Sequence, residues 1–395
     1  MTGQVEHVAG SAAWRGAEAE RLLGFARGSA IEGGFGWLDV DGTLLVPDRR
    51  DLWINARMTY VFSEAHRRLG YQGADVLARH GVTTLLTDFR DPLHGGWYRT
   101  VGDDGPVEDT KACYEHAFVV LAGSAAARSG IPGGEDLLAQ ALDVHGRYFW
   151  DDASGRCVEE RSRDWETVAD YRGANSNMHT VEAYLAAGAV THDQVWVDRA
   201  ASISRAMVAV AEQHDWRLVE HFDAAWTPLP TYNRDRPRDP FRPFGATPGH
   251  AFEWARLLTE VYDATSARAP DPALISSAVA LFDRAVADTD GGVEGFCYTT
   301  DWTGLPVVAE RFHWVACEAI LAADSLRRAV PDDPRFATFY DAWWRFADRH
   351  FVDRERGSWW HELSPDLAPS STTWRGKPDV YHALNACVLG DPAAR

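Results

Sequence analysis

Apolar residues recur along most of the chain with the period of an amphipathic helix, three or four residues apart. Between these segments lie short stretches rich in Gly, Asp and aromatic residues, which hold many of the 17 tryptophans. The periodic segments predict helices over residues 52–69, 110–127, 136–149, 178–189, 200–212, 252–263, 273–287, 312–329, 335–350 and 380–388.

The aromatic stretches recur at intervals of roughly 55 to 75 residues, as expected if each repeat holds two long helices. Their aromatic alternation is typical of short β-hairpins. They span residues 34–39, 95–99, 151–159, 221–226, 292–302 and 357–362. We therefore predict an all-α fold, an (α/α)6 toroid of about twelve helices with hairpins at one end of its cavity.

No linker rich in Pro, Gly and Ser divides the repeats, so residues 1–395 are expected to form one domain. Two insertions, residues 160–176 and 228–248, each precede an inner helix. Long insertions of this kind form either functional rims or plain surface excursions.

The formal net charge of −19 disfavours nucleic acid and anionic membranes as partners. The first 16 residues lack the apolar core of a signal peptide, and no stretch is long and apolar enough to span a membrane, so we expect a cytoplasmic protein. The five cysteines lie far apart without a C-x-x-C pair and are expected to be buried free thiols.

Each insertion leads into a predicted helix start that carries a histidine. Ser176 is the expected N-cap of one helix, while Thr247 caps the other and Pro248 takes its first position. His179 and His250 would then lie in the first turn, where the helix dipole favours a neutral ring that can accept a proton.

A carboxylate follows each of these histidines by three residues, in the pairs His179/Glu182 and His250/Glu253. On one helical face, such a carboxylate can hold the second ring nitrogen and fix the tautomer. A single pair of this kind could be a local hydrogen bond, but the duplication favours a pair of general bases. Carboxylate-bridged metal sites use the reverse order, Glu-x-x-His, so a metal site is not favoured.

A third histidine, His382, follows a Pro-Asp turn near the C-terminus, where a closed toroid brings it next to the first repeat. There, Trp53 and Arg57 lie four residues apart on one helical face. A sugar site needs an aromatic plane and a fixed cation, which these residues can supply. Alternatively, they are a packing pair with an extended arginine.

The chain resembles the N-acylglucosamine 2-epimerase superfamily through motifs that follow one another along nearly its whole length. Residues 376–382 and 232–244 most resemble its aldose–ketose isomerase branch, which includes mannose and sulfoquinovose isomerases. The shared motifs are Arg57-Met58-x-Tyr60, Asp109-Thr110-Lys111-Ala112-x-Tyr114-x-His116, Asn175-x-Asn177-Met178-His179, Pro248-Gly249-His250-x-x-Glu253-Trp254 and Trp360-His361-Glu362-Leu363.

The resemblance implies an (α/α)6 barrel that needs no metal or other cofactor. It implies that His250 and His382 transfer protons, that Glu253 orients His250, and that Arg57 stabilises an enediolate. It also implies that His179 binds the sugar or assists ring opening. The other substrate-binding residues expected are Trp53, Tyr114, Asn175, Arg242, Trp314 and Glu318.

Several alternatives remain at this level. The same residues could catalyse isomerisation or 2-epimerisation, the latter on N-acylglucosamine or another sugar. An inverting glycoside hydrolase could use two of Glu253, Glu318 and Asp379, and a non-catalytic sugar-binding protein is a third class. The expected partner is a monosaccharide: D-mannose, D-lyxose or sulfoquinovose. A homo-oligomer is possible.

Four arginines in the second insertion bear on the substrate. They either neutralise nearby aspartates or supply a cation for a sulfonate group. They are Arg234, Arg236, Arg238 and Arg242.

Overall fold

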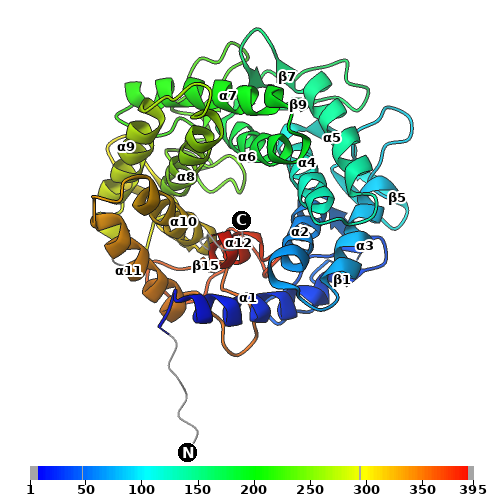
Figure 1. Cartoon of the computed structure of the whole chain (residues 1–395), viewed down its shortest axis with the longest axis horizontal. Coiled ribbons are helices and arrows are strands. Elements are labelled where there is room, and N and C mark those ends of the chain that lie inside the picture. Colours follow the sequence, from blue (N-terminus) through cyan, green and yellow to red (C-terminus); the bar gives the residue numbers. More distant parts are fainter. Residues whose placement is uncertain (1–7, 47, 293–294, 390–395) are drawn as a thin grey trace, which may run out of the picture.

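The structure is a computed structural model that describes residues 8–46, 48–292 and 295–389. Its helices form two concentric rings, with even-numbered helices inside and odd-numbered helices outside (Figure 1). Twelve α-helices lie within the described residues. Two predicted segments extend beyond the described residues, at residues 293–294 of one turn segment and at residues 1–7 of the N-terminal segment.

The inner helices are buried nearly all round because they contact both their neighbours and the outer ring. In the first of them, every residue is buried. The inner ring consists of α2 (Leu52–Glu64), α4 (Cys113–Arg128), α6 (Ala174–Thr191), α8 (Pro248–Thr265), α10 (His313–Ala329) and α12 (Tyr381–Leu389).

The outer helices are amphipathic and bury one stripe against the inner ring. In α11, the stripe runs from Phe336 through Tyr340, Trp343 and Trp344 to Ala347, while the opposite face is polar. The outer ring consists of α1 (Ala12–Ala26), α3 (Ala74–Leu86), α5 (Gly134–Tyr148), α7 (Gln194–Gln213), α9 (Ala273–Asp288) and α11 (Arg335–His350).

Short antiparallel strands fix where most inner helices begin. In four repeats, a strand directly before an inner helix pairs with a strand that follows the next outer helix. These pairs are β3 (Arg49–Asp51) with β4 (Thr100–Gly102), β6 (Lys111–Ala112) with β9 (Glu160–Arg161), β10 (Arg172–Gly173) with β11 (His221–Phe222), and β14 (Arg311–Phe312) with β15 (Glu362–Leu363). Before α8, an isolated bridge from Ala246 to Thr300 takes this role.

The remaining strands complete small hairpins. They are β1 (Ala30–Ile31) with β2 (Gly34–Phe35), β5 (Gly105–Glu108) on β4, β7 (Trp150–Asp151) with β8 (Arg156–Cys157), and β12 (Thr299–Thr300) with β13 (Pro306–Val308).

The two ends of the chain close the ring, since α1 packs outside α12 (Figure 1). Arg15 of α1 donates to the Cys387 carbonyl at 3.2 Å and to the Tyr340 hydroxyl at 2.8 Å. Glu18 accepts the indole hydrogen of Trp359 at 2.6 Å. These bonds join the first outer helix to the last repeat.

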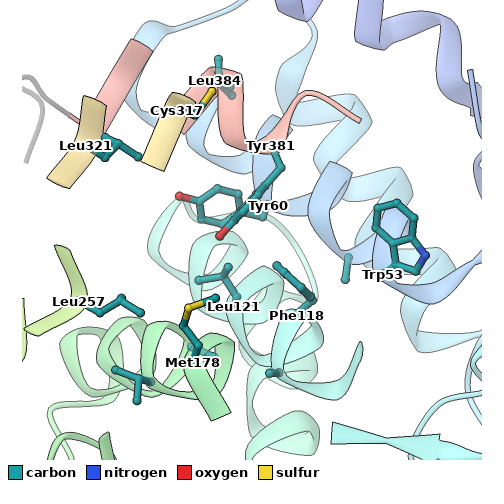
Figure 2. Close-up of a cluster of buried hydrophobic side chains, with 14 of the residues drawn as sticks. Trp53, Tyr60, Phe118, Leu121, Met178, Leu257, Cys317, Leu321, Tyr381 and Leu384 are labelled. Carbon is teal, nitrogen blue, oxygen red and sulfur yellow. The ribbon is translucent and has the colours of Figure 1, made fainter. Parts of the chain in front are cut away.

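The middle of the inner ring is filled by a cluster of large side chains (Figure 2). The Tyr381 ring lies 5.3 Å from the Tyr60 ring and 5.5 Å from the Phe118 ring, centroid to centroid. Met178 and Leu257 extend the cluster from α6 and α8. This layer separates the two ends of the toroid.

Ten of the twelve helices correspond to predicted segments, whereas no segment was predicted for α1 or α3. In the other ten, the errors lie mainly at the helix starts. α11 spans the predicted residues, whereas residues 110–112 precede α4 because β6 pairs with β9 there. Helix α6 begins at Ala174 with Gly173 as its N-cap, so the predicted cap at Ser176 is wrong. Thr247 occupies the N-cap position of α8 and Pro248 follows it, as predicted, but the Thr247 side chain makes no capping hydrogen bond within the described residues.

All five cysteines are buried and free, as predicted. No helix within the described residues has the length and apolar character needed to cross a membrane.

Candidate active site

One cavity opens among the N-terminal ends of the inner helices. All six inner helices contribute to it, because each hairpin delivers a helix start to the same end of the ring. Trp53, Arg57, Tyr114, Asn175, His179, His250, Glu253, Trp314 and His382 line it, which brings nine of the predicted site residues together. The converging positive helix ends favour negative charge that develops there.

His250 is held by a carboxylate that the sequence analysis did not identify. Its Nδ1 lies 2.9 Å from Oε1 of Glu220, so Nε2 is left for the cavity. Glu220 immediately precedes β11, and its carbonyl accepts from the Ala174 amide at 2.9 Å. The prediction that Glu253 orients His250 is therefore wrong, because β11 places Glu220 at this ring nitrogen.

His382 has the same arrangement on the other side of the cavity. Its Nδ1 lies 2.9 Å from Oε1 of Glu318. Burial, with Arg57 nearby, holds the pKa of His382 well below its usual value, so the ring is neutral at neutral pH. The Trp314 ring contacts both histidines, with its centroid 5.2 Å from that of His250 and 5.8 Å from that of His382.

His179 lies about one helical turn deeper than predicted, because the N-cap of α6 is Gly173, three residues before Ser176. Its Nδ1 lies 3.4 Å from Oε2 of Glu182, as the i to i+3 spacing predicted, and 3.7 Å from Oε1 of Glu253. Burial lowers the pKa of His179. This position fits a binding role better than a first-turn base.

Arg57 is a fixed, buried cation. It donates to Tyr114 Oη at 3.0 Å and to Asp379 Oδ2 at 3.3 Å. The guanidinium lies 4.4 Å above the Phe118 ring and 5.1 Å above the Trp53 ring. Burial opposes its charge, but the nearby oxygens of Tyr114 and Asp379 raise the pKa of Arg57.

Arg256 joins three carboxylates beneath the histidines. It lies 3.2 Å from Glu318, 3.3 Å from Glu182 and 3.5 Å from Glu253. Glu182 also accepts the Tyr381 hydroxyl at 2.6 Å. Two of these carboxylates hold catalytic-site histidines, so Arg256 is the counter-ion of the network that orients His179 and His382.

His179, Glu182 and Glu253 have the spacing of a metal site, with one ligand atom from each within 4.8 Å of the others. The guanidinium of Arg256 already faces both carboxylates. A divalent ion would sit next to this buried positive charge, so the donor set fits a metal poorly.

Four polar atoms of the cavity have no hydrogen-bond partner among the described residues, although they are buried. Each belongs to a residue that lines the cavity. They are Arg57 Nε, Asn175 Oδ1, Glu253 Oε1 and His313 Nε2. Because unpaired buried polar groups are costly, this set is suited to a ligand with many hydroxyl groups.

Two histidines that the sequence analysis did not assign also line the cavity. The rings of His313 and His361 stack at 3.9 Å, and His361 Nε2 lies 3.1 Å from the Asp379 carbonyl. Burial lowers the pKa of His313 to about 4. His313 is the first residue of α10, so its position at a helix start after a hairpin was the available signal.

The second insertion forms one wall of the cavity through Pro240 and Phe241. Phe241 contacts Trp374 edge to face at 5.2 Å and lies 6.1 Å from Tyr114. In the first insertion, only Asn175 reaches the cavity. The interpretation of the second insertion as a functional rim thus fits the structure.

Two predicted substrate-binding residues do not line the cavity. Arg242 lies 4.2 Å above the Tyr171 ring and 3.6 Å from Glu160, which directs it to the neighbouring hairpin. Glu318 lies behind His382 and Arg256. The structure therefore places neither residue in the cavity wall, and Glu318 instead contacts His382 behind it.

The model of the N-acylglucosamine 2-epimerase (GlcNAc 2-epimerase) family matches residues 33–386. The chain belongs to this family. Within the GlcNAc 2-epimerase family, it is 46% identical over 385 residues to D-mannose isomerase of Thermobifida fusca, covering 95% of this chain and 93% of that protein. It is 43% identical over 382 residues to D-mannose isomerase of Pseudomonas cannabina pv. alisalensis, covering 95% of this chain and 91% of that protein.

The fold is also similar to that of a solved D-mannose isomerase structure, with a TM-score of 0.90 and 28% sequence identity. The superposition covers 98% of this chain and 99% of the D-mannose isomerase chain. These comparisons confirm the resemblance and the isomerase branch inferred from the motifs. They also confirm the (α/α)6 barrel and the isomerase class of the enzyme.

Proposed function

We propose that the protein interconverts D-mannose and its ketose, D-fructose, with His250 and His382 as the acid–base pair. The observation that carries this proposal is the matched pair of histidines that both contact Trp314, each with Nδ1 bonded to a carboxylate. Such a pair leaves two Nε2 atoms facing one substrate.

In the proposed reaction, the open-chain aldose binds with its C1–O1 carbonyl near Arg57. One histidine removes the C2 proton, and the electron pair forms the C1=C2 bond while O1 takes negative charge. Arg57 and the surrounding helix N-termini stabilise this enediolate. The proton on O2 then passes to O1, C1 receives a proton from a histidine, and the C1=C2 electron pair forms the new C1–H bond as the O2 electrons form the C2=O bond of the ketose.

The cavity favours a neutral sugar over an anionic one. Arg57 is the only arginine or lysine among the described residues that line it, and Asp379 already neutralises this cation. Arg242, the candidate cation for a sulfonate, points away. We therefore place D-mannose and D-lyxose ahead of sulfoquinovose as substrates.

The hydrolase alternative needs two free carboxylates on opposite sides of a glycosidic bond. Asp379 is bonded to Arg57, and Glu318 is bonded to His382 and Arg256. Glu253 lines the cavity, but its Oε1 lies 3.5 Å from Arg256 and 3.7 Å from His179. The arrangement therefore supports proton transfer between carbons rather than hydrolysis.

Proton NMR in D2O tests the proposal, with D-mannose, D-lyxose and sulfoquinovose in separate tubes and no added metal. We expect the ketose of D-mannose, with deuterium at C1. A C2 epimer without ketose would assign the protein to the epimerases, and an unchanged spectrum with every sugar would contradict the proposal.

A cytoplasmic location is proposed on the sequence alone.

A further inference from the structure

Two cysteines and a histidine meet in a buried cluster outside the sugar cavity. Cys113 is the first residue of α4, His145 lies on α5, and Cys157 ends β8. All three residues are fully buried, and one ligand atom from each lies within 4.8 Å of the others. The cavity lining includes none of them, and the proposed reaction does not use them.

We propose that Cys113, His145 and Cys157 form a structural binding site for a thiophilic divalent cation such as Zn2+. The geometry supports this assignment. With Zn–S near 2.3 Å and Zn–N near 2.0–2.1 Å, a tetrahedral ion separates sulfur and nitrogen by roughly 3.6 Å. In the structure, Cys113 Sγ lies 3.6 Å from His145 Nε2.

Surrounding contacts prepare His145 as a ligand. Its Nδ1 lies 2.9 Å from the Tyr184 hydroxyl, which can accept the Nδ1 hydrogen and leave the Nε2 lone pair facing the sulfur.

A fourth ligand atom is available from α6. Thr180 donates its hydroxyl hydrogen to the Ser176 carbonyl at 2.8 Å, and its oxygen lies 3.5 Å from Cys113 Sγ. This separation is close to another edge of the same tetrahedron. Two thiolates, a neutral imidazole and a hydroxyl would bind a divalent cation with no net charge, which suits a buried position.

The backbone around the cluster is already fixed. The Cys157 amide donates to Asn177 Oδ1 at 2.9 Å, and the Cys157 carbonyl accepts from Asn177 Nδ2 at 3.1 Å. The Cys113 amide donates to the Glu159 carbonyl at 2.8 Å. A bound ion would therefore join α4, α5, α6 and the β7–β8 hairpin without rearranging them.

This site would influence the cavity through adjacent residues. Cys113 precedes Tyr114, which contacts Arg57, and Thr180 follows His179. Neither ligand reaches the sugar, so the ion would have a structural role. It would also enter during folding, because the finished site is closed to solvent.

The test uses the full chain produced in cells grown with Zn2+ or with Co2+, so that the ion is present while the protein folds. Elemental analysis should find about one Zn2+ per chain, and the cobalt form should show thiolate-to-cobalt charge-transfer absorption in the near ultraviolet. Zinc-loaded protein should melt a few degrees above protein folded without metal.

Cys113→Ser, Cys157→Ser and His145→Gln should each lose most of the metal and weaken the charge-transfer band. Cys317→Ser is the matched control, since Cys317 is also fully buried on an inner helix but lies outside the cluster. If the variants fail to fold, the wild-type cobalt spectrum still decides, because the other candidate cluster contains no sulfur.

Protein that folds with both cysteines as free thiols and takes up neither metal would overturn the proposal. So would metal content that is unchanged by both serine variants, because the ion would then lie elsewhere. A Cys113–Cys157 disulfide in freshly isolated protein would also overturn it.

Discussion

The two ends of the inner ring carry opposite kinds of chemistry. At the N-terminal ends, histidines, tryptophans and one paired arginine surround the sugar cavity. At the C-terminal ends, a second cavity is lined by arginines and carboxylates, many of them paired within one helix. Glu64 binds Arg67 and Arg68, and Asp324 binds Arg327 and Arg328.

The helix dipole accounts for much of this difference. Parallel inner helices present positive ends at one opening and negative ends at the other, so cations are stabilised at the C-terminal end. The N-terminal end favours neutral imidazoles and a developing enediolate. One end therefore provides conditions for proton transfer, while the other contributes to stability. Arg256 and Glu182, which line the second cavity, also belong to the network behind the histidines.

The largest expected effect is at the N-terminal end. His250→Ala and His382→Ala should each lower kcat/KM for D-mannose by about 10²–10⁴, because each removes a general acid or base. The free energy of unfolding should change little by comparison. Arg128→Ala, at the exposed rim of the second cavity, is the control and should keep wild-type activity. If Arg128→Ala lost as much kcat/KM as the histidine variants, the proposal that only the N-terminal end carries the catalytic residues would be contradicted.

The next effect concerns Arg256 and the carboxylates around it, which lie between the two cavities. Arg256→Met leaves Glu182, Glu253 and Glu318 without their shared cation, which should cost about 3–5 kcal/mol of stability in urea unfolding. It should also shift the pH–rate profile, because Glu182 and Glu318 hold His179 and His382. Arg256→Lys should restore part of both properties. An unchanged pH profile in a folded Met variant would limit Arg256 to a structural role.

A smaller effect distinguishes the two candidate partners of His250. Glu220→Gln should lower kcat by about 10–100-fold, because the bond to Nδ1 positions the ring. Glu253→Gln should act mainly through His179 and the bound sugar, and so raise KM more than it lowers kcat. The reverse pattern would restore the original assignment of Glu253 to His250.

The free energy of unfolding should fall as the pH falls, in part because of His313 in the sugar cavity. Burial lowers the pKa of His313 to about 4, whereas the unfolded chain has the usual value near 6.5. Between these values, the unfolded state binds more protons, so stability falls as the pH falls through this window. His313 should contribute up to about 1.4 kcal/mol per pH unit to the slope, in addition to the other buried histidines. Urea unfolding at pH 7, 6 and 5 measures it, and His313→Asn should reduce it; an equal slope in this variant would contradict the assignment.

The smallest effect on activity is expected at the C-terminal end. Glu64→Gln removes the charge that pairs with Arg67 and Arg68, and because Glu64 is buried the change should cost up to about 3–5 kcal/mol, as for a broken buried pair. Thermal unfolding should show this loss of stability, whereas kcat/KM should stay at the wild-type value. A large loss of activity would show that this end takes part in catalysis.

Local patterns in the sequence were sufficient for most of the fold. The boundaries of α11 were predicted because its apolar stripe from Phe336 to Ala347 is strongly periodic. The start of α6 was not, because it depends on the pairing of Gly173 with His221, which is distant in the sequence. The strand pairing that fixes the start of an inner helix joins residues far apart in the sequence, so a local pattern cannot predict it.

The same reasoning explains the candidate site. Arg57, His179, His250 and His382 were found because each lies at or near a helix start with a recognisable neighbour. Glu220 was missed because it lies in the segment before β11 and reaches His250 only through the fold. Arg242 was misplaced because sequence alone could not show that its guanidinium packs on Tyr171.

The most direct test of the central claim follows the proton at C2. D-mannose that carries deuterium at C2 is incubated with wild type, His250→Ala and His382→Ala, and the loss of deuterium from C2 is recorded by NMR. We expect the wild type to remove the label and form ketose, and both variants to lose ketose formation, at least one of them because C2 is no longer deprotonated. Wild-type rates of label removal and ketose formation in both variants would contradict the histidine mechanism.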